Sequence, residues 1–122
     1  MERTQIIQHR GTPVVLLDYS GLRVEAETLV EIDKSKQFIV RHLKPDGTHL
    51  TLTDGTDASY TPRVLEALKQ LAAHDKPYVK AGAAVSNSRL VRVVVAAVAV
   101  FTGRHIPVFP TRDQALEWLM KQ

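Results

Sequence analysis

The chain contains no cysteine among its 122 residues, which excludes disulfide bonds, thiolate metal sites and cysteine nucleophiles. The same absence is typical of cytoplasmic proteins, so we expect a cytoplasmic location. Aromatic residues are few, at three Phe, three Tyr and one Trp, and none alternates with basic residues in the manner that stacks nucleobases. Because the net charge of +3 is also spread along the chain, we expect no nucleic-acid partner.

Long apolar runs and clusters of metal ligands are also missing from the sequence. The most apolar stretch, Leu90–Phe101, is shorter than the roughly 20 residues that cross a bilayer. None of the histidines has the i,i+4 spacing or the companion carboxylates of a metal site. These histidines are His9, His42, His49, His74 and His105. No G-x-S-x-G motif is present, which makes a hydrolase the weakest functional class. We therefore expect no metal, no cofactor and no enzymatic activity.

The composition is otherwise ordinary for a globular protein, with 44% hydrophobic and 24% charged residues. A chain of this length usually forms one domain, so we predict a single domain over residues 1–122. Apolar runs alternate with amphipathic segments, which favours strands that alternate with helices. The predicted strands are Thr4–His9, Val14–Leu17, Leu50–Thr53, Ala81–Val85 and Ile106–Phe109. The predicted helices are Glu25–Arg41, a segment from Pro62 to His74, Leu90–Phe101 and a segment that follows Thr111.

Local signals set the ends of these elements. Thr61 followed by Pro62 is a strong helix start, and a glycine at position 103 is a typical helix stop. The segment Thr111–Gln114 reads as a capping box. For residues 38–53, a hairpin around residues 44–47 competes with the helix. We favour the helix because the apolar stripe of Glu25–Arg41 has helical spacing.

The element order is thus β-β-α-β-α-β-α-β-α. Alternation of this kind predicts an α/β fold with a mainly parallel five-stranded sheet and flanking helices. The short turn at residues 11–13 predicts that the first strand is antiparallel and lies at one edge of the sheet.

Several segments of the sequence resemble the STAS domain, a family named for sulphate transporters and anti-sigma-factor antagonists. They are Val15–Leu22 (VLLDYSGL), Leu50–Asp54 (LTLTD), Tyr78–Val85 (YVKAGAAV) continuing through Phe101–Arg104 (FTGR), and Val108–Leu119 (VFPTRDQALEWL). The chain is most similar to the stand-alone bacterial SpoIIAA-like branch, whose members are often called STAS/SEC14-domain proteins. The resemblance covers nearly the whole chain and implies the SpoIIAA-like (STAS) fold.

The resemblance implies a regulatory, non-enzymatic module for signal transduction that acts by protein–protein contact. In the anti-sigma-factor antagonists, a partner kinase phosphorylates a serine or threonine at the start of the second helix, within an Asp-Ser-Ser-Gly-like motif. The corresponding stretch here, Asp54–Thr61 (DGTDASYT), is longer and lacks that motif. Thr56, Ser59 and Thr61 are the candidate phosphoacceptors that remain.

Polar residues follow three of the predicted strands. Because ligands of an open α/β sheet bind outside the carboxyl ends of its strands, these residues predict a shared edge for a ligand or partner. They are Asp18, Tyr19, Ser20, Asp54, Ser86, Asn87 and Ser88. The same residue types cap helices and shape turns, which is the competing structural explanation. The alternative function is therefore a carrier or sensor of a small ligand, such as a lipid or a nucleotide.

The segment Leu90–Phe101 is apolar on almost every side except at Arg92, so it must be buried against something. We expect one side of this helix to join the core and the other to contact a protein partner, with a homodimer as one such arrangement. Contact with a membrane surface is the least favoured option, because the helix lacks the strongly polar opposite face of interfacial helices.

Overall fold

The computed structural model describes residues 2–122, so Met1 of the predicted domain lies outside the described residues. Five strands form one sheet in the order β1-β2-β3-β4-β5. The strands are β1 (Thr4–His9), β2 (Thr12–Asp18), β3 (His49–Asp54), β4 (Val79–Val85) and β5 (Val108–Phe109). The helices are α1 (Glu25–His42), α2 (Pro62–Asp75), a 3₁₀ turn η1 (Lys76–Tyr78), α3 (Arg89–Thr102) and α4 (Arg112–Leu119). This order confirms the predicted alternation.

The pairing of the strands confirms the mainly parallel sheet. Strand β1 is antiparallel to β2 and lies at one edge, whereas β2, β3, β4 and β5 pair in parallel. Strand β5 is shorter than predicted, because it pairs with β4 only at Val108 and Phe109. Pro107 precedes it and has no N–H to donate, although its carbonyl oxygen still accepts from the N–H of Ala84 at 2.9 Å.

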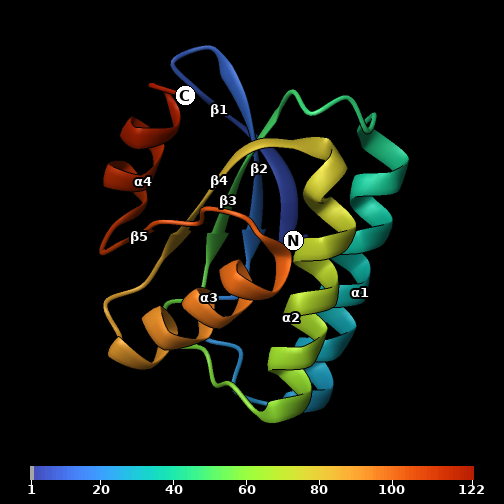
Figure 1. Ribbon diagram of the computed structural model, residues 1–122, viewed down its shortest axis with the longest axis vertical. Helices are drawn as coiled ribbons and strands as arrows, with labels where there is room; N and C mark the ends of the chain where they lie inside the picture. Colours follow the sequence, from blue (N-terminus) through green and yellow to red (C-terminus); the bar gives the residue numbers. More distant parts are fainter. Residues whose placement is uncertain (1) are drawn as a thin grey trace.

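Helices cover both faces of the sheet (Figure 1). Helix α4 lies over one face, where Ala115 and Leu119 pack into a cluster with buried side chains of β2, β3 and β4. Helices α1 and α2 lie over the other face, where Ile32, Val64 and Leu71 pack with a second set of β2 side chains. Strand β2 contributes to both clusters, which explains its unbroken run of apolar residues.

The predicted helix signals act as expected. The Ser88 hydroxyl accepts from the N–H of Leu90, and Gly103 ends α3 in the left-handed region at a φ of 68°. The Thr61 hydroxyl accepts from the N–H of Val64 at the start of α2, where Pro62 is the first helical residue. The Thr111 hydroxyl caps α4 by accepting from the N–H of Gln114.

Helix α1 continues to His42, so the competing hairpin over residues 38–53 is wrong. Its buried side consists of Thr28, Ile32, Ser35 and Ile39. The side chain of Ser35 is fully buried between α1 and the sheet. Its polar hydroxyl is tolerated there because it forms hydrogen bonds with the hydroxyls of Thr4 and Tyr19, each at 2.6 Å. Within residues 2–122, no helix has both the length and the apolar character needed to cross a membrane.

Candidate functional site

The carboxylates that end β2 and β3 are brought together by the parallel register, which pairs Asp18 with Asp54. Arg112, the first residue of α4, binds both of them. Its Nε lies 2.7 Å from Asp54 Oδ2, and its Nη2 lies 3.3 Å from Asp18 Oδ2. Because Asp54 is buried, this arginine neutralises a carboxylate that would otherwise be costly to remove from water.

The surroundings of Asp18 and Arg112 favour their charged forms. Partial burial raises the pKa of Asp18, but the hydroxyl and N–H of Ser20 and the Arg112 guanidinium outweigh that effect and hold the pKa below its usual value. Burial lowers the pKa of Arg112, but the hydrogen bond and the attraction to Asp54 outweigh that effect and hold the pKa above its usual value. Asp18, Asp54 and Arg112 therefore form an ion-pair network in which one guanidinium partly neutralises two carboxylates.

The three serines of the predicted edge also form hydrogen bonds within it. The Ser20 hydroxyl donates to Asp18 Oδ1 at 2.6 Å, and the Ser86 hydroxyl accepts from the N–H of Ser88 at 3.1 Å. Asn87 is exposed in the turn before α3. Tyr19 points away from the edge and is buried, with its hydroxyl bonded to Ser35.

The three candidate phosphoacceptors lie between β3 and α2 in different settings. The Thr61 hydroxyl donates to Glu25 Oε1 at 2.5 Å while it caps α2. Ser59 is half-buried and its side chain lines a cavity described below. Thr56 is half-buried, and its backbone N–H donates to Asp54 Oδ1 at 2.9 Å. Of the three, Thr61 is the most constrained.

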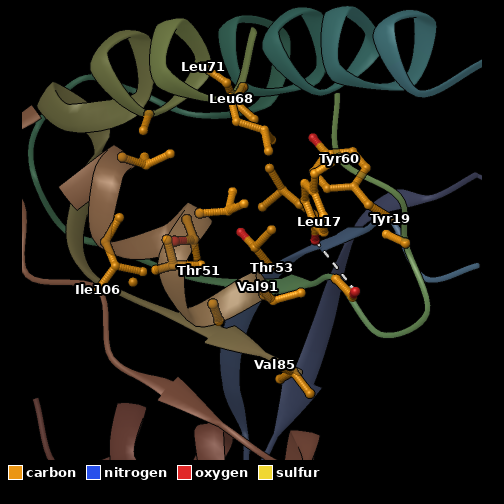
Figure 2. Close-up of a pocket in the computed structure, with 18 of the residues that line it drawn as sticks. Leu17, Tyr19, Thr51, Thr53, Tyr60, Leu68, Leu71, Val85, Val91 and Ile106 are labelled. Atoms are coloured by element: carbon orange, nitrogen blue, oxygen red, sulfur yellow. Dashed lines mark hydrogen bonds between the residues drawn. The ribbon is translucent and has the colours of Figure 1, made fainter. Parts of the chain in front are cut away.

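A cavity of about 90 Å³ lies between the sheet and helices α2 and α3. Figure 2 shows Leu68 and Leu71 of α2 on one side of it and Thr51 and Thr53 of β3 opposite them. Its length runs from Tyr19 and Tyr60 toward Ile106 (Figure 2). The lining is mostly apolar and includes the inward side of α3, at Val91, Val94, Val95 and Val98.

The small residues of β4 make room for this cavity and for one arginine. A β-carbon at Gly82 would lie 2.8 Å from Thr51 Oγ1 and 2.9 Å from Arg104 Nη2, closer than real contacts allow. A glycine inside a strand often marks such a close approach. Gly82 therefore lets the Arg104 side chain lie against β4, at the end of the cavity near Ile106.

Arg104 and Asp75 are the only charged residues in the cavity lining. Arg104 Nη1 donates to the carbonyl oxygen of Ala72 at 3.1 Å, and burial lowers the pKa of its guanidinium. Asp75 is buried at 4% exposure and accepts from His74 Nδ1 at 2.9 Å. Burial raises the pKa of Asp75 to about 6, although His74 and Arg104 oppose that change.

Arg112, Gly82, Asp75 and Arg104 had not been predicted as site residues from the sequence. The interior glycine of β4 is the signal that could have indicated a close approach at this strand. Within residues 2–122, no group of three or more His, Asp or Glu side chains is placed to hold a metal ion.

Comparison with known proteins gives one informative match. No protein-family model matches the chain, and no curated protein matches it significantly. A solved structure from Shewanella loihica PV-4, described as an uncharacterized protein of the DUF3478 family with a SpoIIAA-like fold, superposes with a TM-score of 0.72. The two chains are 15% identical, and the match covers 95% of this chain and 91% of the other. At this identity the likeness concerns the fold alone.

Proposed function

Because the chain has the SpoIIAA-like fold and contains an apolar cavity, we propose that it is a cytoplasmic, non-enzymatic module that binds a small, mostly apolar molecule. The cavity under α2 and α3 is the observation that carries the proposal. Protein interiors are close-packed, and a well-formed apolar pocket with a few convergent polar groups is the usual form of a ligand site. This observation supports the carrier or sensor hypothesis over a module that only contacts proteins.

The size of the cavity limits the ligand. A cavity of about 150 Å³ lined by apolar side chains holds a benzene molecule. The cavity here, at about 90 Å³, suits an aliphatic chain of a few carbon atoms. A nucleotide is larger and carries several negative charges, whereas the lining offers only Arg104 as a basic residue. We therefore favour a short aliphatic ligand over a nucleotide or a long lipid chain.

Replacement of Val95 with phenylalanine tests the proposal. Val95 lies on α3, is half-buried and lines the cavity. A phenyl ring at this position is expected to fill the cavity and to weaken ligand binding at least tenfold, which corresponds to about 1.4 kcal/mol of binding free energy. Binding of pentan-1-ol and pentanoate is measured by calorimetric titration. Val40→Phe is the matched control, since Val40 is 57% exposed on α1 and lies outside the cavity lining. Equal binding by the two variants, or no binding by the wild type, contradicts the proposal.

A protein partner is the second candidate function, and the outward face of α3 favours it. Leu90, Val93, Val100 and Phe101 are 57%, 66%, 85% and 51% exposed. Their spacing places them on one side of the helix. The sequence from residue 76 to residue 112 contains no aspartate or glutamate, whereas Arg89 and Arg92 are exposed on α3 itself. The face therefore suits a protein surface that is apolar with an acidic rim, and it is unsuited to a second copy of itself.

The candidate phosphoacceptor loop adjoins this helix, since a β-carbon at Gly55 would lie 3.8 Å from Val91 Cγ1. If a phosphorylation switch is present, we propose Thr56 as its site, because the Thr61 hydroxyl is already bound to Glu25 and to the backbone of α2. A phosphate at Thr56 would place negative charge next to the apolar, basic helix and change the surface that a partner meets.

This choice predicts a difference between two alanine variants. Thr61→Ala removes a helix cap and is expected to lower the free energy of unfolding by about 1 kcal/mol, whereas Thr56→Ala is expected to change it by less than about 0.5 kcal/mol. Urea unfolding measures both values. Peptide mapping of the protein isolated from its own host then locates any phosphate. Modification of Thr61 or Ser59, with Thr56 unmodified, would contradict the assignment.

A further inference from the structure

The cavity has one polar end, where its cation forms no salt bridge. Arg104 lines that end, and no carboxylate within residues 2–122 lies within salt-bridge distance of its guanidinium, although Asp75 of the same lining attracts it from further away. The hydrogen bond from Arg104 Nη1 goes to the carbonyl oxygen of Ala72. A half-buried guanidinium has lost much of its hydration, so an unpaired one is costly. Its planar set of N–H groups matches the two oxygens of a carboxylate. An anionic group in the cavity would supply a directly bound partner, which Asp75 does not.

Asp75 limits the charge of that anionic group. Asp75 lines the same cavity and is attracted to Arg104. His74 beside it and Lys36 of α1 also favour its charged form. The charge of Asp75 in turn raises the pKa of Tyr19, in the loop after β2. A dianion such as a phosphate monoester would meet one arginine and one aspartate, and would be held more weakly than a monoanion. An amine would be repelled by Arg104.

We propose that the ligand is a short-chain monocarboxylate, whose carboxylate binds the Arg104 guanidinium and whose alkyl chain extends along the cavity toward Tyr60. This inference rests on the proposed function, because it names the chemical class of molecule that the cavity holds. The apolar side chains of Leu68, Val94 and Val98 line the cavity along which the alkyl chain lies. The cavity volume limits that chain to a few carbon atoms.

The position of Asp75 links binding to pH. When Asp75 is ionised, it repels a carboxylate bound at Arg104; when it is protonated, it does not. Since burial places the pKa of Asp75 at about 6, the affinity for a carboxylate is expected to fall as the pH rises from 5.5 to 7.5. The affinity for a neutral alcohol of the same length is expected to stay constant across this range.

Calorimetric titration with four probes tests the inference: pentanoate, pentan-1-ol, pentylamine and inorganic phosphate. We expect pentanoate to bind most tightly at pH 5.5 and to weaken about fivefold to tenfold by pH 7.5. Arg104→Gln is expected to weaken pentanoate about tenfold or more and to change pentan-1-ol less than twofold. Arg92→Gln is the matched control, because Arg92 is exposed on α3 and lies outside the cavity lining. Asp75→Asn is expected to remove the pH dependence.

The outcomes separate this inference from the proposed function. Binding of pentan-1-ol with equal or weaker binding of pentanoate overturns the carboxylate assignment and leaves the apolar cavity as a ligand site. Tighter binding of pentylamine or phosphate than of pentanoate also overturns the assignment. Failure of all four probes overturns both proposals. Loss of pentan-1-ol and pentanoate together in Arg104→Gln assigns Arg104 a structural role and overturns its role as the carboxylate partner.

Discussion

Replacing Asp75 with asparagine is expected to raise the free energy of unfolding at pH 7.5 by about 2 kcal/mol, although the substitution removes a residue with a hydrogen-bonded partner. The reason is burial, which raises the pKa of Asp75 to about 6 from its ordinary value of 3.8. One pKa unit corresponds to about 1.4 kcal/mol, so ionisation of this carboxyl in the folded state costs roughly 3 kcal/mol at neutral pH. Asparagine keeps the oxygen that accepts from His74 but loses the attraction to Arg104, which reduces the gain.

The sign of this effect determines its pH dependence. The pKa of Asp75 is higher in the folded state, so its contribution to stability is full below about pH 4 and is lost as the pH rises through about 6. The difference between Asp75→Asn and the wild type should therefore be small near pH 4 and reach its maximum above pH 7. Urea unfolding between pH 4.5 and 8 measures it. Asp33→Asn, at an exposed position of α1, is the control and should stay within about 0.5 kcal/mol of the wild type. A destabilised Asp75→Asn at pH 7.5 contradicts the prediction.

Replacing Arg112 with leucine is expected to lower the free energy of unfolding by about 3 kcal/mol at pH 7. The substitution leaves Asp54 buried and places it beside Asp18 with no neutralising cation. Removal of one partner from a buried pair costs about 3–5 kcal/mol, and the lower value applies because the Arg112 side chain is 40% exposed. Urea unfolding at pH 7 measures the loss.

A double variant separates the charge effect from the loss of packing. Removing both charges in Arg112→Leu with Asp54→Leu should recover part of the stability, because the cost of the single variant is mainly that of an unpaired buried carboxylate. The pH dependence gives a second check. Since the pKa of Asp18 lies below its usual value, the stability that depends on its ionised form is present above about pH 4 and is lost as the pH falls. The deficit of Arg112→Leu should therefore shrink as the pH falls below about 4. A double variant less stable than the single variant argues against the ion-pair explanation.

The fold was predictable because its signals are local. The Thr61-Pro62 start of α2 and the Ser88 and Gly103 ends of α3 depend on residues within one helical turn of each boundary. The unbroken apolar run of β2 indicates burial on both faces, and alternation of elements then predicts the parallel sheet. Strand β5 was predicted too long because Ile106 is apolar without being hydrogen-bonded to β4. Strands β2 and β4 were predicted too short, since each begins two residues before its predicted start.

The candidate site was only partly predictable, because its geometry depends on residues far apart in the sequence. The sequence predicted that polar residues gather at the strand ends, and Asp18 and Asp54 do lie together there. It did not predict Arg112, which is 58 positions from Asp54 and reaches it only through the packing of α4. The cavity likewise depends on Gly82 and Arg104, which belong to different elements. Asp75 was not singled out from the sequence, and its burial follows from tertiary packing alone.

The composition of α3 also governs what happens when the chain unfolds. Six of its 14 residues are valine, a residue type that favours strands, so this segment is helical only while the sheet and α2 hold it. Residues 93–101 contain no charge, proline or glycine, and such segments pair readily with their own copies once they are exposed. Heating would thus expose a segment that is prone to aggregate before it refolds. Persistence of the native state at high temperature would then be set by the rate of unfolding, and α3 would be the segment that makes unfolding irreversible.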